Sequence, residues 1–109
     1  MKYVCFVYGE EPSMQTIDDR ECLANGEALR QGGHYVAAES LQPVSTAATV
    51  RVRNGKVSVT DGPFAETKEQ LGGFYMIEAR DLNDALQVAA KIPSAKTGTI
   101  EVRPIEVFS

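Results

Sequence analysis

The chain has 109 residues, of which 43% are hydrophobic and 24% charged, so it is large enough for one globular domain with its own core. Its formal net charge of −4 disfavours a protein that binds nucleic acid directly, because such proteins need a basic face for phosphates. The apolar start is too short for a signal peptide or a membrane span, and one His with two widely spaced Cys residues makes no metal-site pattern, so we expect a cytoplasmic, metal-free domain without membrane contact.

The first part of the chain predicts a strand, a helix and a second strand. Residues 2–8, KYVCFVY, are β-branched and aromatic, which is typical of a buried strand. Ser13 can act as the N-cap of a helix that runs to about Arg30 and ends at the glycine pair 32–33. Residues 34–41 form the second strand, which Pro43 stops. The predicted apolar stripe of the helix consists of Met14, Ile17, Ala24, Ala28 and Leu29.

The middle of the chain predicts a hairpin. Residues 49–53 and 56–60 alternate between apolar and polar side chains, as strands do. Asn54-Gly55 between them is a strong hairpin signal, because both residues tolerate the positive φ angles of a two-residue turn. Alternation places the apolar residues of each strand on one face, namely Val50 and Val52, then Val57 and Val59.

The last part of the chain predicts a strand, a helix and a final strand. Residues 73–79 read as the strand, and Asp81 caps a helix that Pro93 ends. Residues 99–108 alternate as a final strand, in which Pro104 limits the hydrogen bonding. The predicted inner face of the helix consists of Leu82, Ala85, Leu86 and Ala89.

This order of elements predicts an α+β fold in a single domain, residues 1–109. It fits the ferredoxin-like split βαβ sandwich, with an antiparallel sheet and an added central hairpin. Both helices would then cover one face of the sheet and leave the other face bare. A bare apolar sheet face on a small domain commonly serves dimerisation.

The segment DGPFAETKEQLGG, residues 61–73, is unusually rich in charge for a connector. As a plain connector, its Asp-Gly-Pro start makes a turn, a helical turn could join Glu66 to Glu69 or Gln70, and its charges face solvent. As a ligand loop, its carboxylates, among them Asp61 and Glu66, would do acid/base work, and Lys68 would hold an anion. Phe64 would then cover an apolar wall of the site. Both interpretations remain open on this evidence.

His34 is the only side chain whose unperturbed pKa lies near neutrality. It is either an ordinary surface residue or the partner of Asp61 in a catalytic proton-transfer pair. Arg51 either binds an acidic ligand or pairs with a neighbouring carboxylate. Tyr75 is expected to be half-buried with its hydroxyl anchored. The ligand-binding candidates are thus Phe64, Glu66, Lys68, Arg51 and Tyr75.

The run VRVRNGKVSVTDGPFAETKEQLGGFYMIEARDLNDALQVAAKIPSA, followed by GTIEVRPI, closely resembles the DGPF branch of the YCII-related family. The resemblance implies a ferredoxin-like fold that pairs into a homodimer with a dimeric α+β barrel. The wider family includes enzymes with a His-Asp pair in a cleft, which implies a role for Asp61, with His34 as the one histidine present. Some members are encoded beside or fused to sigma factors, which implies a possible sigma-factor association.

Two functional hypotheses follow. The first is a small cofactor-independent enzyme that performs isomerase- or lyase-like acid/base chemistry on a small molecule in a cleft of the dimer. The second is a non-catalytic module that senses a ligand or binds a partner linked to transcription regulation. Neither the fold nor the sequence identifies the ligand.

Overall fold

The structure, a computed structural model, describes residues 1–108 of the chain. In that part it has a four-stranded antiparallel sheet, a separate two-stranded hairpin and three α-helices. The strands of the sheet are β1 (Lys2–Gly9), β2 (Tyr35–Ser40), β5 (Gln70–Glu78) and β6 (Thr99–Pro104), and those of the hairpin are β3 (Ala48–Arg53) and β4 (Lys56–Asp61). The helices are α1 (Glu11–Gln15), α2 (Asp19–Gln31) and α3 (Leu82–Ala89), with short 3-10 turns at Val44–Thr46 and Pro93–Lys96.

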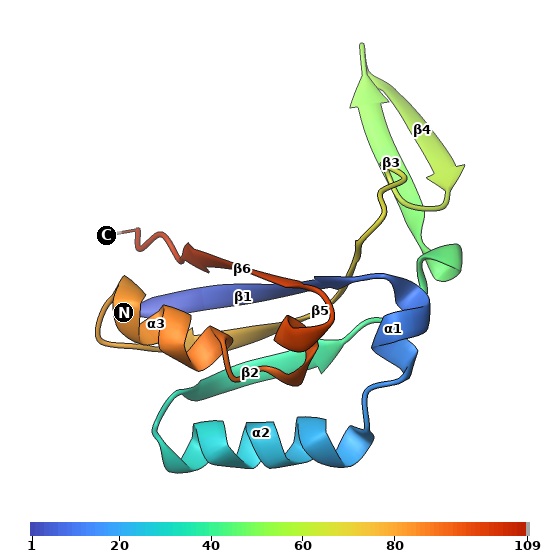
Figure 1. Ribbon diagram of the computed structural model, residues 1–109. Coiled ribbons are helices and arrows are strands. Elements are labelled where there is room, and N and C mark those ends of the chain that lie inside the picture. The colour runs from blue at the N-terminus through green and yellow to red at the C-terminus, as the bar shows by residue number, and fades with distance from the viewer. Residues whose placement is uncertain (109) are drawn as a thin grey trace.

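The strand order confirms the predicted split βαβ plan. The sheet runs β2-β5-β1-β6, and every neighbouring pair is antiparallel (Figure 1). β1 and β2 are therefore parallel strands joined through α2, with β5 between them. In the same way, β5 and β6 are joined through α3, with β1 between them. The predicted α+β class is thus observed.

Strand alternation separates a buried face of the sheet from an open one. Tyr3, Cys5 and Val7 of β1 point into the core, where they join Leu29 of α2 and Val88 of α3. Both helices therefore cover the same face. The open face carries the side chains of the alternate positions, which are only half-buried: Val4, Phe6 and Tyr8 of β1 and Phe74 and Met76 of β5.

The single helix predicted from Ser13 to Arg30 is wrong, because the structure has two. Ser13 lies inside α1 and is not an N-cap. The helical conformation ends after α1, where the hydroxyl of Thr16 donates to the carbonyl of Ser13. Asp18 then caps α2, and its carboxylate accepts from the backbone N–H of Arg20 at 2.8 Å. Local side-chain bonds to the backbone thus compete with a continuous helix.

The predicted inner faces of the helices are partly wrong. In α2, Ala24 and Ala28 are exposed, and Leu29 alone among its residues is buried. In α3, Leu82 and Leu86 are about half exposed, whereas Ala85, Val88 and Ala89, together with Ile92 just after the helix, pack into the core. Both rows of α3 have helical spacing, so position on the sheet rather than side-chain size decided which row is buried.

The hairpin β3–β4 is formed as predicted. Asn54 and Gly55 have φ angles of 52° and 75°, as the two-residue turn requires. Figure 1 shows the hairpin projecting away from the sheet and the helices. We call the hairpin, Ala48–Asp61, the arm. In the described part of the chain, no helix has the length and apolarity to cross a membrane.

Candidate functional site

An open cavity of about 570 Å³ lies on the helix side of the sheet. Its walls come from α1, the start of α2, the ends of β2 and β5 and the residues 41–43 that follow β2. It exists because α2 meets the core only through Leu29, near its C-terminal end, and its first turns stay exposed. The cavity is therefore a consequence of how α2 sits on the sheet.

The glycine pair at residues 72–73 allows the backbone to come close together at this cavity. Met14 of α1 fills the space above Gly72, where a Cβ atom would collide with its sulfur. A Cβ on Gly73 would lie 2.7 Å from the carbonyl oxygen of Glu39, so β2 approaches here more closely than a side chain permits. The close approach expected at a glycine pair in a strand is thus observed.

Acidic side chains are the charged groups that line the cavity. They are Glu11, Asp19 and Glu39, and no Lys, Arg or His is among the described lining residues. Glu11 is held in place, since one of its carboxylate oxygens accepts from the backbone N–H of Val44 at 3.1 Å. The rest of the lining includes apolar side chains such as Ile17 and Leu71. The cavity thus has a mixed polar and apolar lining whose charged side chains are acidic.

Tyr75 and Cys22 also line this cavity. Tyr75 is half-buried as predicted, and burial raises the pKa of its hydroxyl. Burial, followed by the nearby charge of Asp19, raises the pKa of the Cys22 thiol. The buried Cys5 has a pKa of about 11, also because of burial. At neutral pH these groups therefore stay protonated, and the thiols are poor nucleophiles.

A second, smaller hollow of about 130 Å³ lies on the polar face of the arm. It brings together two predicted ligand-binding residues, Arg51 of β3 and Phe64 of the loop that follows β4. Phe64 is 80% exposed, so its ring covers little of the protein surface. Within residues 1–108, Arg51 forms no ion pair, and its guanidinium is available to solvent.

The DGPF loop is held by its backbone and by side chains at its far end. Gly62 adopts a φ of 100°, its N–H donates to the carbonyl of Ala47, and its carbonyl accepts from the Thr49 hydroxyl at 2.9 Å. Lys68 lies 3.7 Å from the carboxylate of Glu10, an exposed pair that contributes well under about 1 kcal/mol. The helical turn considered for Glu66 and its neighbours is not formed.

Asp61 does not hold this turn together. It is the last residue of β4, it is exposed, and it lies opposite Ala48. Among the described residues, its carboxylate has no hydrogen-bond or ion-pair partner. Glu66 is likewise exposed and has none in that part of the chain. Both carboxylates are thus available for contacts outside the single chain.

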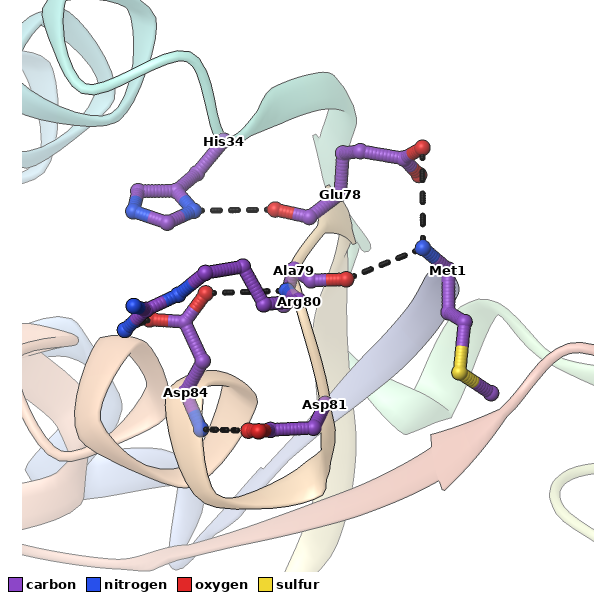
Figure 2. A network of polar contacts seen from close by, with 7 residues as sticks. All are labelled: Met1, His34, Glu78, Ala79, Arg80, Asp81 and Asp84. Carbon is purple, nitrogen blue, oxygen red and sulfur yellow. Dashed lines mark hydrogen bonds and ion pairs between the residues drawn. The ribbon is translucent and has the colours of Figure 1, made fainter.

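His34 lies at the other end of the sheet, between α2 and β2 (Figure 2). Its Nδ1 is 2.9 Å from the carbonyl oxygen of Glu78, the last residue of β5. A carbonyl only accepts, so Nδ1 carries the proton and donates it. The backbone of His34 also accepts from the N–H of Glu78 at 2.8 Å. These bonds give His34 a structural contact at the junction of β2 and β5.

One chain does not bring the predicted pair His34 and Asp61 together. His34 binds the C-terminal end of β5, whereas Asp61 belongs to the arm, which joins the sheet at the opposite ends of β2 and β5. The nine residues of β5 alone span about 30 Å. Proton transfer between the two side chains of one chain is therefore not supported by this geometry.

Beside His34, the carboxylate of Asp84 is the most enclosed acid of the structure, at 7% exposure (Figure 2). It accepts from the backbone N–H of Arg80 at 3.0 Å and from its guanidinium at 3.3 Å, and these bonds lower its pKa. Its own N–H donates to the capping carboxylate of Asp81 at 2.8 Å. Asp84 thus ties the end of β5 to the start of α3.

Replacing Asp84 by Asn is expected to lower the melting temperature at pH 7, because the bonds to Arg80 lose their charge. The folded carboxyl has a lowered pKa, so its stabilising contribution is complete above the ordinary Asp pKa of about 3.9 and is lost as the pH falls through the folded value. Thermal unfolding of both proteins from pH 7 to pH 2 should therefore show a difference that shrinks in acid. Replacing the exposed Glu106 by Gln is the control; a difference that is the same at both ends of the range would contradict the prediction.

The cavity residues Glu11, Asp19 and Met14 were missed by the sequence reasoning. They precede and follow a helix break that the sequence pattern did not reveal, and they are distant along the chain from β5. One signal could have located the cavity, namely the glycine pair 72–73. It indicates a close backbone approach, although it does not say which residues approach it.

Comparison with known proteins gives two matches over the full span. The sequence model of the YCII-related domain matches residues 1–109. A protein of Rhizobium meliloti (strain 1021), itself described as uncharacterized, is 37% identical over 119 aligned residues, which cover 99% of this chain and 94% of that protein. Neither match names a substrate, a ligand or a partner.

Proposed function

Because the chain belongs to the YCII-related family, which matches it over residues 1–109, we propose that it is a small-molecule-binding protein that works as a homodimer. The observation that carries the binding function is the open cavity of about 570 Å³ between α1, α2 and the ends of β2 and β5. Its volume lies within the range of roughly 300–1,000 Å³ that is typical of ligand pockets. The homodimer is supported by the open, partly apolar face of the sheet.

The lining of the cavity favours a neutral or cationic ligand with an apolar body. Glu11, Asp19 and Glu39 would repel an anion, and the described lining holds no basic side chain to offset them. The candidate anion-binding residues lie elsewhere, since Lys68 is paired with Glu10 and Arg51 lies on the arm. An acidic substrate would thus have to bind outside this cavity.

Ligand binding without chemistry is the simpler form of this function. The thiol of Cys22 and the hydroxyl of Tyr75 have raised pKa values and stay protonated, and His34 lies away from the cavity. A sensor or partner-binding module needs none of these groups to exchange protons. Its link to a sigma factor rests on the family resemblance alone.

An acid/base enzyme is the second candidate. The observation that favours it is the carboxylate of Asp61, which neither supports the turn nor binds another described residue. In an isomerase- or lyase-like step, such a free carboxylate would act as the general base. This candidate requires Asp61 to meet a substrate or a second chain, because His34 of the same chain is too distant.

Thermal-shift screening tests the binding function. Small aromatic amines such as tyramine and benzylamine would be compared with benzoate and phenylacetate of similar size. A ligand at one hundred times its Kd stabilises the folded state by about 2.7 kcal/mol, which raises the melting temperature by several degrees in a domain of this size. We expect some amines to raise it and the carboxylates to leave it unchanged.

Two variants locate the binding site. Ala38→Leu narrows the cavity, to which Ala38 contributes from β2, and should abolish the shift. Ser58→Leu fills the hollow of the arm instead and should leave the shift intact. A shift that survives Ala38→Leu and disappears with Ser58→Leu would move the site to the arm and refute the cavity.

A further inference from the structure

The arm, Ala48–Asp61, lacks the support that a two-stranded hairpin needs. Its two strands pair only with each other and not with the four-stranded sheet. An isolated two-stranded hairpin is marginally stable in water and requires packing against another element. The arm instead projects from the body, as Figure 1 shows. The radius of gyration of the chain is accordingly 15.7 Å, against about 13 Å for a compact domain of this length.

One face of the arm carries four valines. Val50 lies opposite Val59, and Val52 lies opposite Val57, so the four side chains share one face. They are 56–68% exposed. The other face carries Arg51 opposite Ser58, together with threonines. A hairpin that worked alone in water would have two polar faces, so the valine face is built to be covered.

Asp61 belongs to this valine face. Side chains alternate along a strand, so residues 57, 59 and 61 of β4 point to the same side. Asp61 lies opposite Ala48, at the base of the arm and next to the pair Val50–Val59. Any molecule that covers the valines therefore also approaches the free carboxylate of Asp61.

The sheet face and the arm together have about the area that a dimer interface needs. From the usual strand spacing and rise, the open face of the four-stranded sheet has a footprint of roughly 450 Å². The valine face of the arm adds roughly 200 Å². A standard interface buries about 800 Å² on each partner, so the sheet face alone is small for a stable dimer, whereas sheet and arm together approach the required size.

We propose that the arm binds a second copy of this chain through its valine face and thereby brings Asp61 to the subunit interface. We call this interaction the arm contact. This inference rests on the homodimer of the proposed function and specifies how it is held. In a two-fold dimer each interface patch is used twice, so both arms lose their exposed valines in one symmetric contact. The open face of the sheet and the valine face of the arm are then covered together.

Sedimentation velocity of the full chain tests the arm contact. Val50→Lys combined with Val59→Glu replaces two of the four valines of this face by charged residues, and the two new charges lie opposite each other and pair across the hairpin, which preserves the hairpin. We expect the dimer Kd to rise about 100-fold or more in this double variant. Ser58→Glu, opposite Arg51 on the polar face, is the matched control and should leave the Kd within about threefold.

Thiol labelling tests the position of Asp61. In a Cys22→Ser background, which removes the exposed native thiol, Asp61→Cys should react slowly with iodoacetamide in the dimer. The same thiol should react at least tenfold faster when the Val50→Lys and Val59→Glu changes are added. Ser58→Cys, on the polar face, should react at one rate in both backgrounds. Unfolding curves of each variant verify that the fold is kept.

The outcomes distinguish the arm contact from the homodimer of the proposed function. The arm contact is supported if the wild-type protein is a dimer, the Val50→Lys, Val59→Glu variant dissociates, and Asp61→Cys is protected only in the dimer. An equally tight dimer in that variant, or an unprotected Asp61→Cys, refutes the arm contact but leaves the proposed homodimer in place. A wild-type chain that is monomeric at micromolar concentration overturns both.

Discussion

Gly98→Ala is expected to prevent folding or to lower the free energy of unfolding by at least about 3 kcal/mol. Gly98 comes directly before β6, and a Cβ atom there would collide with the backbone carbonyl oxygen of Tyr8. It would also lie 3.1 Å from the Cα of Gly9. Tyr8 is paired with Thr99 across the sheet, so neither backbone can yield without breaking this pairing. Urea unfolding followed by circular dichroism measures the effect.

Two other glycines provide matched controls. Gly26 lies inside α2, and a Cβ atom there would meet nothing within 4 Å apart from the adjacent backbone of the helix itself, so Gly26→Ala should stabilise the protein by about 0.5–1 kcal/mol. At Gly72 the new methyl group would meet the flexible side chain of Met14, so Gly72→Ala should destabilise less than Gly98→Ala. Equal stability of the Gly98 and Gly26 variants would show that β1 and β6 do not approach each other as described.

Ile77→Ala is expected to lower the free energy of unfolding by about 2–5 kcal/mol. Ile77 is fully buried in β5, and its strand neighbours are Tyr3 of β1 and Tyr35 of β2. Shortening the side chain removes apolar contacts and leaves a cavity between the sheet and the helices, which close packing does not refill. The measurement is chemical unfolding at a fixed protein concentration, since dimerisation would make stability depend on concentration.

A graded series makes this result specific. Ile77→Val should lower the free energy of unfolding by about 0.5–1.5 kcal/mol. Val107→Ala, at a side chain that is 86% exposed, should change it by less than about 0.5 kcal/mol. If Ile77→Ala were as mild as Val107→Ala, β5 would not form the centre of the core.

Strand positions and turns were predictable from the sequence because their causes are local. The Asn54-Gly55 turn follows from the conformations that these two residues tolerate. The start of α3 follows from the carboxylate of Asp81, which accepts the N–H of Asp84 as predicted. Alternation likewise identified the valines as one face of the hairpin.

The helices were predicted less well because two patterns competed in each. The Thr16 and Asp18 side chains broke the first helix, although its apolar residues suggested continuity. In α3, Leu82 and Leu86 stay about half exposed whereas Ala85 and Val88 are buried, because position on the sheet rather than side-chain size decided which row faces the core. Intrinsic helix patterns carry no information about the surface on which a helix will pack.

Some residues of the candidate site were predicted from the sequence and others were not. Tyr75 was expected to be half-buried and lines the cavity, and Arg51 and Phe64 of the predicted ligand set share the hollow of the arm. The acidic lining of the cavity was not foreseen, because its members come from separate elements. Whether Asp61 acts in catalysis stays a prediction, whereas the labelling and sedimentation experiments test whether it lies at a subunit interface.

By itself, the sequence determined the strands, the hairpin turn, the Asp81 cap and the two faces of the arm, since each depends on neighbouring residues along the chain. Tertiary structure alone decided that α2 stands off the sheet and leaves a cavity, that His34 and Asp61 lie at opposite ends, and that the valine face of the arm stays uncovered. These features depend on which distant surfaces meet, and that outcome is set by packing over the whole chain rather than by any local pattern.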